Sequence, residues 1–85
     1  MSFSIQSSRF GNYELRVLEF RGEYRYEIWW HTGKALTAVG KGSEKYSDVY
    51  EARYSAVLHL ASVLPRPHSE RLIASQAELA WEPWP

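Results

Sequence analysis

The sequence lacks cysteine altogether, so the chain has neither a disulfide framework nor a thiolate metal site. It also lacks any apolar stretch close to the roughly 20 residues that span a bilayer. Its first residues carry neither the basic region nor the apolar run of a signal peptide. We therefore expect a soluble, cytoplasmic protein without membrane association.

Net charge is absent too, because ten Lys and Arg residues balance ten Asp and Glu residues. A dedicated nucleic-acid binder usually shows a basic excess, and a nucleic-acid mimic shows a long acidic run. Neither class fits the overall composition, although a local basic patch stays compatible with it.

Signals of catalysis are equally scarce. The three histidines, His31, His59 and His68, include no pair at the i,i+4 spacing of a helical metal site. Residues 40–43, Gly-Lys-Gly-Ser, lack the spacing of a phosphate-binding loop, and no serine sits in a Gly-x-Ser-x-Gly elbow. We expect no catalytic residue, no metal and no cofactor, although a triad assembled in space stays open.

Aromatic residues are abundant, with four Trp, six Tyr and three Phe among 85 residues. A chain of this size buries only about 60–65% of its unfolded surface. Large rings bury much area per residue and can hold such a small core together. The length predicts one domain over residues 1–85.

The clearest structural signal is a predicted hairpin of residues 13–20 and 24–31, with a turn at Arg21-Gly22-Glu23. Apolar and polar side chains alternate along both arms, which is the period of a sheet with one covered face. The predicted covered side carries Tyr13, Leu15, Val17, Tyr24, Tyr26, Ile28 and Trp30. The predicted solvent side carries Glu14, Arg16, Arg25, Glu27 and Trp29, together with Leu18 and Phe20.

Shorter elements surround this hairpin. We expect an edge strand over residues 1–7, turns at 7–12 and 32–34, a short arm at 35–39, and a bend or flexible loop at 40–43. Asp48 and Glu51 have capping-box spacing, with Ser47 as the competing cap. They precede a stripe of apolar residues at helical spacing, and Pro65 and Pro67 end the predicted helix. The stripe comprises Val49, Ala52, Ala56, Leu60 and Val63, widened by Val57 and Leu64. His59 falls on the polar side of the helix.

Residues 69–81 form a second helical candidate. The predicted fold class is therefore α+β: a three- to four-stranded antiparallel meander over residues 1–47, covered on one face by a helix at 48–64. Residues 65–85 add a C-terminal helix and a Trp/Pro tail.

Three short motifs occur along the middle of the chain: Gly-Glu-Tyr-Arg-Tyr at 22–26, Thr-Gly-Lys at 32–34, and Tyr-Ser-x-x-x-Glu-Ala at 46–52. Together with the element order, they resemble the small YegP-like (DUF1508) bacterial domains over residues 12–64. The chain departs from that family at Trp29-Trp30, lacks the glycine before Tyr46, and adds a C-terminal extension. A fainter similarity is to the double-stranded-RNA-binding domain, with Ser43-Glu44-Lys45 in place of its Ser-Lys-Lys. Neither resemblance supplies a catalytic residue.

The feature that points to function is the pair Trp29-Trp30, because neighbours on a strand face opposite sides. Trp30 is predicted to lie under the helix. Trp29 falls on the solvent side with Leu18, Phe20 and Arg25, the composition of a protein–protein hot spot. The alternative is that Trp81 or Trp84 covers Trp29. These two tryptophans either plug the core or form a docking tail.

We therefore expect a small non-enzymatic binding protein that docks on a protein partner or on its own copy. Inhibitors and accessory factors of phages and mobile elements are proteins of this kind. The predicted partner-binding residues are Leu18, Phe20, Arg25, Trp29, Trp81 and Trp84. The alternative function is a nucleic-acid-binding module that uses Lys34, Lys41, Lys45 and Arg53.

Overall fold

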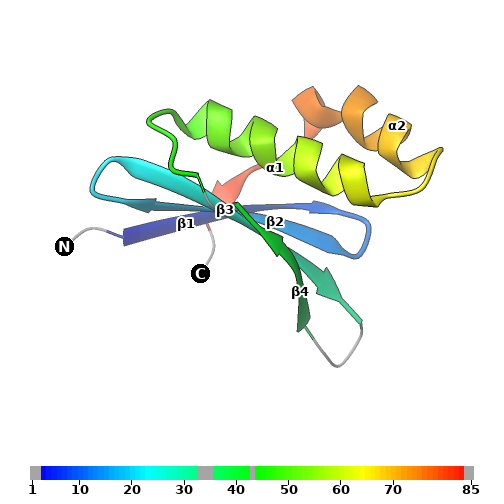
Figure 1. Ribbon diagram of the computed structural model, residues 1–85, viewed down its shortest axis with the longest axis horizontal. Coiled ribbons are helices and arrows are strands. Elements are labelled where there is room, and N and C mark those ends of the chain that lie inside the picture. The colour runs from blue at the N-terminus through cyan, green and yellow to red at the C-terminus, as the bar shows by residue number, and fades with distance from the viewer. Residues whose placement is uncertain (1–2, 33–35, 43, 84–85) are drawn as a thin grey trace.

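A computed structural model describes residues 3–32, 36–42 and 44–83. The described chain forms two layers, with an antiparallel sheet below and the helices above it (Figure 1). The strands are β1 (Phe3–Phe10), β2 (Tyr13–Phe20), β3 (Glu23–His31), β4 (Leu36–Lys41) and β5 (Glu82–Pro83). Their order in the sheet is β4-β3-β2-β1-β5. Because β1 to β4 follow one another as antiparallel neighbours, the predicted α+β meander is confirmed.

The β2–β3 hairpin has the predicted pairing. Leu15 lies opposite Ile28, and Val17 lies opposite Tyr26. Arg21 and Gly22 connect the strands with φ angles of 54° and 79°. Two positive φ angles are typical of the type I′ turn, whose twist matches that of the flanking strands.

The outer strands differ from the expectation. β1 runs to Phe10, so residues 7–10 are strand and only Gly11 and Asn12 turn. It is not an edge strand along its whole length, because β5 pairs with it at Gln6 and Ser7. The sequence missed β5 because a two-residue strand has no period to detect.

The predicted bend at residues 40–43 is wrong for its first two residues, which continue β4. Gly40 lies opposite Ile28, next to a shift in the strand register. The amide of Gly42 then donates a hydrogen bond of 3.2 Å to the carbonyl oxygen of Tyr26. Residues 33–35 and 43 lie outside the described residues, and with them parts of the predicted turn, arm and bend.

The long helix α1 (Val49–Val63) begins where the cap predicted it. The Asp48 carboxylate accepts a hydrogen bond of 2.9 Å from the amide of Tyr50, which satisfies one of the unpaired donors at a helix start. The second helix is shorter than the predicted 69–81. It consists of α2 (His68–Ala74), and a 3-10 turn, η1 (Gln76–Glu78), follows it. The chain then turns so that Leu79 and Trp81 pack against the core.

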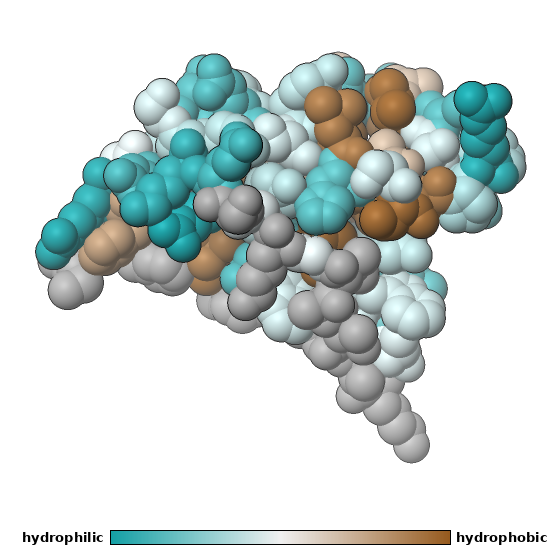
Figure 2. Space-filling view, in the orientation of Figure 1, coloured by the Kyte–Doolittle hydropathy of each residue, from teal (hydrophilic) through white to brown (hydrophobic). Residues whose placement is uncertain are grey.

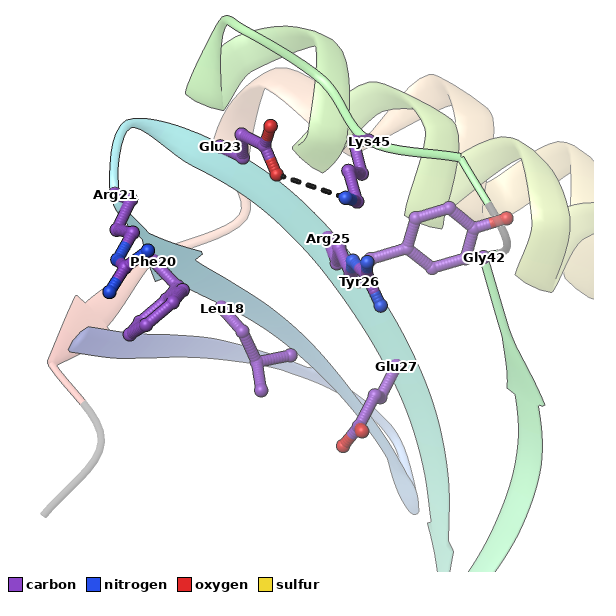
Figure 3. A pocket seen from close by; sticks show the side chains of 9 residues that line it. All are labelled: Leu18, Phe20, Arg21, Glu23, Arg25, Tyr26, Glu27, Gly42 and Lys45. Atoms are coloured by element: carbon purple, nitrogen blue, oxygen red, sulfur yellow. Dashed lines mark ion pairs between the residues drawn. The ribbon is translucent and has the colours of Figure 1, made fainter. Parts of the chain in front are cut away.

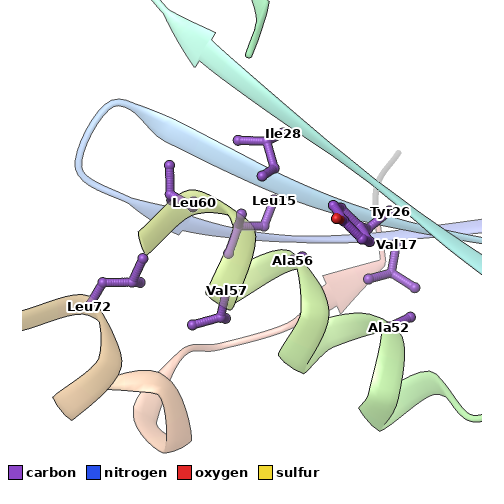
Figure 4. Close-up of a cluster of buried hydrophobic side chains, with 9 residues drawn as sticks. All are labelled: Leu15, Val17, Tyr26, Ile28, Ala52, Ala56, Val57, Leu60 and Leu72. Atoms are coloured by element: carbon purple, nitrogen blue, oxygen red, sulfur yellow. The ribbon is translucent and has the colours of Figure 1, made fainter. Parts of the chain in front are cut away.

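The core lies between α1 and the middle of the sheet (Figure 4). Small residues of α1 let the helix approach a sheet that carries larger side chains, as the sequence predicted. One predicted member of the apolar stripe, Val63 at the C-terminal end of α1, is exposed instead. The buried apolar side chains are Leu15, Val17, Tyr26, Ile28, Ala52, Ala56, Val57, Leu60 and Leu72.

Candidate protein-binding site

Both helices lie on the same side of the sheet, and no described helix covers the opposite side (Figure 1). We call that opposite side the open face. Leu18 lies opposite Arg25 in the hairpin, and Glu14 lies opposite Trp29. Since side chains alternate along a strand, these residues and Phe20 all project to the open face. The sequence therefore placed four of the predicted partner-binding residues together.

Three of these four residues line one groove of about 820 Å³, which we call the open-face groove. Leu18 is half-buried, Arg25 is exposed, and the Phe20 side chain is 37% exposed. Figure 3 shows the side chains that line it, with the Tyr26 ring extending from β3 toward Gly42. The full lining comprises Leu18, Phe20, Arg21, Glu23, Arg25, Tyr26, Glu27, Gly42 and Lys45.

The carboxylates of this groove already have partners within the protein. Glu23 forms an ion pair of 3.4 Å with Lys45, and Glu27 accepts a hydrogen bond of 3.0 Å from the indole of Trp29. The guanidinium of Arg21 stacks 5.1 Å from the centre of the Phe20 ring. Within the described part of the chain, Arg25 has no carboxylate partner. The groove thus combines apolar side chains with an arginine that forms no ion pair within the described chain.

Trp29 lies on the open face but is half-buried by polar neighbours. The Arg16 guanidinium lies 5.0 Å from the centre of the indole ring. Arg16 also pairs with Glu14 at 2.8 Å, and His31 Nε2 lies 3.2 Å from the same Glu14 oxygen. Glu14 is consequently only 5% exposed on a face without helices. This network, and not Trp81, covers Trp29.

The C-terminal tryptophan that the structure describes lies on the helix side. Trp81 packs against the core, and the Arg53 guanidinium lies 5.2 Å from its ring centre. Of the two alternatives from the sequence, this geometry matches a plug for the core. Trp84 lies outside the described residues.

Trp30 does not lie under the helix, contrary to the prediction. It projects to the helix side, but its side chain is 42% exposed. Its ring stacks on Tyr13, with 6.4 Å between ring centroids and 22° between ring planes. The alternation predicted the correct face, but α1 does not extend over this position.

The residues of the nucleic-acid alternative are engaged elsewhere or fall outside the description. Lys45 pairs with Glu23, and the Arg53 Nε donates a hydrogen bond of 2.7 Å to the Gln6 side chain. Arg53 also lies against the rings of Tyr50 and Trp81. Lys34 and the side chain of Lys41 lie outside the described residues. No basic rim made of these four residues is visible in the described chain.

His59 is another difference from the sequence, which placed it on the polar side of the helix. Its Nδ1 lies 2.9 Å from the hydroxyl of Tyr26, and the two rings meet edge to face. Burial raises the pKa of Tyr26. A hydrogen bond to Glu19, followed by burial and by the charges of Glu19 and Asp48, raises the pKa of Tyr24. The Tyr26–His59 pair joins helix α1 to strand β3.

One further surface was missed by the sequence analysis although its signal was present. Tyr50, Tyr54 and Leu58 recur every four residues and are all exposed on the outer side of α1. Figure 2 shows other hydrophobic side chains over the end of α1 and over α2, where Val63 and Ile73 are exposed. The opposite end of the view, over the β2–β3 turn, is mostly hydrophilic, with some hydrophobic surface below it. We call Tyr50, Tyr54 and Leu58 the outer stripe.

A comparison of the chain with protein-family models, curated proteins and solved structures finds no match. The resemblance to YegP-like domains therefore stays a prediction. Among the described residues, no three His, Asp or Glu side chains converge as metal ligands. None of the described helices has the length and apolar character needed to cross a membrane.

Proposed function

We propose that this protein is a non-enzymatic binding protein that docks on a protein partner through the open-face groove. The supporting observation is that Leu18 and Phe20 are accessible beside Arg25, which has no acidic partner within the described chain. The partner segment carries an apolar side chain flanked by carboxylates. An inhibitor or accessory factor would act in this way.

The apolar part of the groove supplies affinity. Each Å² of apolar surface that docking removes from water contributes roughly 25 cal/mol before association costs. Phe20 is a rigid ring that is held from one side by Arg21, so little side-chain freedom is lost when a partner covers it. Aromatic and arginine side chains are the residues enriched in such interfaces.

The charges supply selectivity. Within the described chain no ion pair joins Arg25 to either acid of the groove: Glu23 pairs with Lys45, and Glu27 accepts a hydrogen bond from the Trp29 indole. A carboxylate of the partner gains a charge-assisted hydrogen bond there, whereas a basic surface is repelled.

Site-specific photo-crosslinking in the native host cell tests the proposal. A photoreactive phenylalanine analogue replaces Phe20 in one strain and Tyr54 of the outer stripe in the control strain. The protein crosslinked from position 20 is then purified, and its affinity is measured by calorimetry. Phe20→Ser and Arg25→Glu should each weaken binding by about tenfold or more, whereas Tyr54→Ser should leave it unchanged.

Three results would overturn the proposal. Loss of binding in Tyr54→Ser, but not in Phe20→Ser, assigns docking to the outer stripe. A dimer detected by light scattering and abolished by Arg25→Glu assigns the groove to a second copy. A salt-sensitive mobility shift with nucleic acid that Lys45→Glu abolishes restores the alternative function.

A further inference from the structure

A second groove of about 500 Å³ lies on the helix side of the sheet. There the β1–β2 turn and the end of β3 meet the loop between α1 and α2. We call it the turn groove. It shares no residue with the open-face groove, so it is a separate site. Its lining comprises Phe10, Gly11, Asn12, Tyr13, Trp30, Leu64, Pro65, His68 and Arg71.

One wall of the turn groove is aromatic and accessible. Tyr13 and Trp30 stack with nearly parallel rings, and Trp30 is 42% exposed. Phe10 and Leu64 lie beside them and pack partly against the core. A planar apolar body bound here covers apolar surface that is otherwise in water, and it can stack on or pack edge-on against these rings.

The other side of the groove carries hydrogen-bond donors. Arg71 Nη2 lies 2.7 Å from His68 Nδ1. Because a guanidinium only donates, His68 Nδ1 must accept, and the proton of the neutral imidazole then sits on Nε2. Within the described part of the chain, Arg71 has no carboxylate partner. Its remaining N–H groups and the His68 Nε2–H can therefore bind an anion.

We infer that the turn groove binds a small aromatic carboxylate. The ring of the ligand lies against Tyr13 and Trp30, and its carboxylate accepts hydrogen bonds from Arg71. The two halves of the site select different parts of the ligand: the rings select a flat apolar body, and the guanidinium selects a negative charge over a neutral amide. The volume is within the range of about 300–1,000 Å³ that is usual for small-molecule sites.

Titration with indole-3-acetate and phenylacetate tests this inference, with phenylacetamide as the neutral ligand of matched shape. Binding is followed by the NMR signal of the Trp30 indole N–H, which is assigned by its loss in Trp30→Phe. We expect saturable shifts with both acids, and an affinity for phenylacetamide at least about tenfold lower. Arg71→Met should weaken phenylacetate binding by a similar factor.

Arg66→Met is the matched control, because Arg66 lies on the loop just before α2 but pairs with Glu70 at 3.5 Å and does not line the groove. It should keep the affinity for phenylacetate. Arg71 is exposed, so Arg71→Met should keep the fold, which circular dichroism checks. The inference is overturned if phenylacetamide binds as tightly as phenylacetate, if Arg66→Met is as damaging as Arg71→Met, or if no Trp30 shift saturates below ~10 mM ligand.

Discussion

Replacing Gly40 by alanine should destabilise the protein through one identifiable contact. Gly40 lies in β4 on the helix side, where a Cβ atom would come within 2.7 Å of His59 Cε1 and 2.8 Å of Nε2. The imidazole cannot simply move aside, since its Nδ1 is hydrogen-bonded to Tyr26, which is only 8% exposed. Relieving the clash therefore shifts β4 or breaks the Tyr26–His59 pair.

The size of the effect follows from these contacts. Overpacking a well-filled site costs about 1–3 kcal/mol, and losing the hydrogen bond costs about 0.5–1.5 kcal/mol. Removing a strand glycine recovers about 0.5–1 kcal/mol of backbone entropy. The net loss for Gly40→Ala should be about 1–3 kcal/mol. It lowers the melting temperature by about 4–8 °C per kcal/mol in a domain of this size.

Urea unfolding of a double-mutant cycle with His59→Ala identifies the cause. When the imidazole is absent, the added methyl has room, so the double variant should be more stable than the sum of the two single losses by about 1 kcal/mol. Gly11→Ala is the control, because its cost arises from φ of +61° and its Cβ would meet nothing within 4 Å. It should be additive with His59→Ala. A Gly40→Ala protein as stable as wild type, or full additivity with His59→Ala, would refute the reasoning.

Three further changes test the core, the buried phenol and the open-face network. Leu60→Ala should cost about 2–5 kcal/mol in thermal melts because Leu60 is fully buried, whereas Leu58→Ala, on the exposed outer stripe, should cost about 0.5 kcal/mol or less. Burial raises the pKa of Tyr26 in the folded state, so its contribution to stability is present below about pH 10 and is lost as the pH rises through the folded pKa. A spectrophotometric titration should show late phenolates from Tyr24 and Tyr26, and Tyr26→Phe should reduce the amplitude of this late step; an unchanged late step would contradict the assignment. Glu14→Gln should cost about 1.5–3 kcal/mol because it removes the charge that Arg16 and His31 contact, while Glu78→Gln at an exposed site should be neutral in the same denaturant assay.

The hairpin could be predicted because its information is local. Leu15, Val17, Tyr26 and Ile28 alternate with polar neighbours, and the turn at Arg21-Gly22 lies between two long runs. The start of α1 could be predicted for the same reason, since Asp48 accepts a hydrogen bond from an amide only two residues away. In each case, the residues that determine the structure are neighbours in the chain.

Gly40 in β4 and Gly42 just after it show why other parts could not be predicted. Two glycines close together usually indicate a bend, but here each one makes room for a ring. Gly40 faces His59, and Gly42 faces Tyr26. Those rings come from 16 to 19 residues away in the sequence, and only the packed structure brings them together. The contact of His59 with Tyr26 was missed for the same reason.

The adjacent tryptophans connect the fold to both proposed sites. Alternation sends Trp29 and Trp30 to opposite sides, and neither becomes part of the buried core. The nine residues of β3 span about 30 Å, whereas the 15 residues of α1 span only about 22 Å. The strand is thus about 8 Å longer than the helix that lies on it, which corresponds to roughly two residues. Trp30 occupies this uncovered end.

This difference in length explains the turn groove, because an aromatic pair at the uncovered end of a strand keeps one side accessible. The open-face groove has another origin: both helices lie on one side, so the other side relies on Arg16, Glu14 and Glu27 to shield Trp29. That polar network ends before Leu18 and Phe20, whose neighbour Arg25 has no described acidic partner. Extending α1 by one turn should therefore reduce the exposure of Trp30 and weaken carboxylate binding in the turn groove. It should leave docking at the open-face groove unchanged. The phenylacetate titration measures the first effect, and the calorimetry of partner binding measures the second.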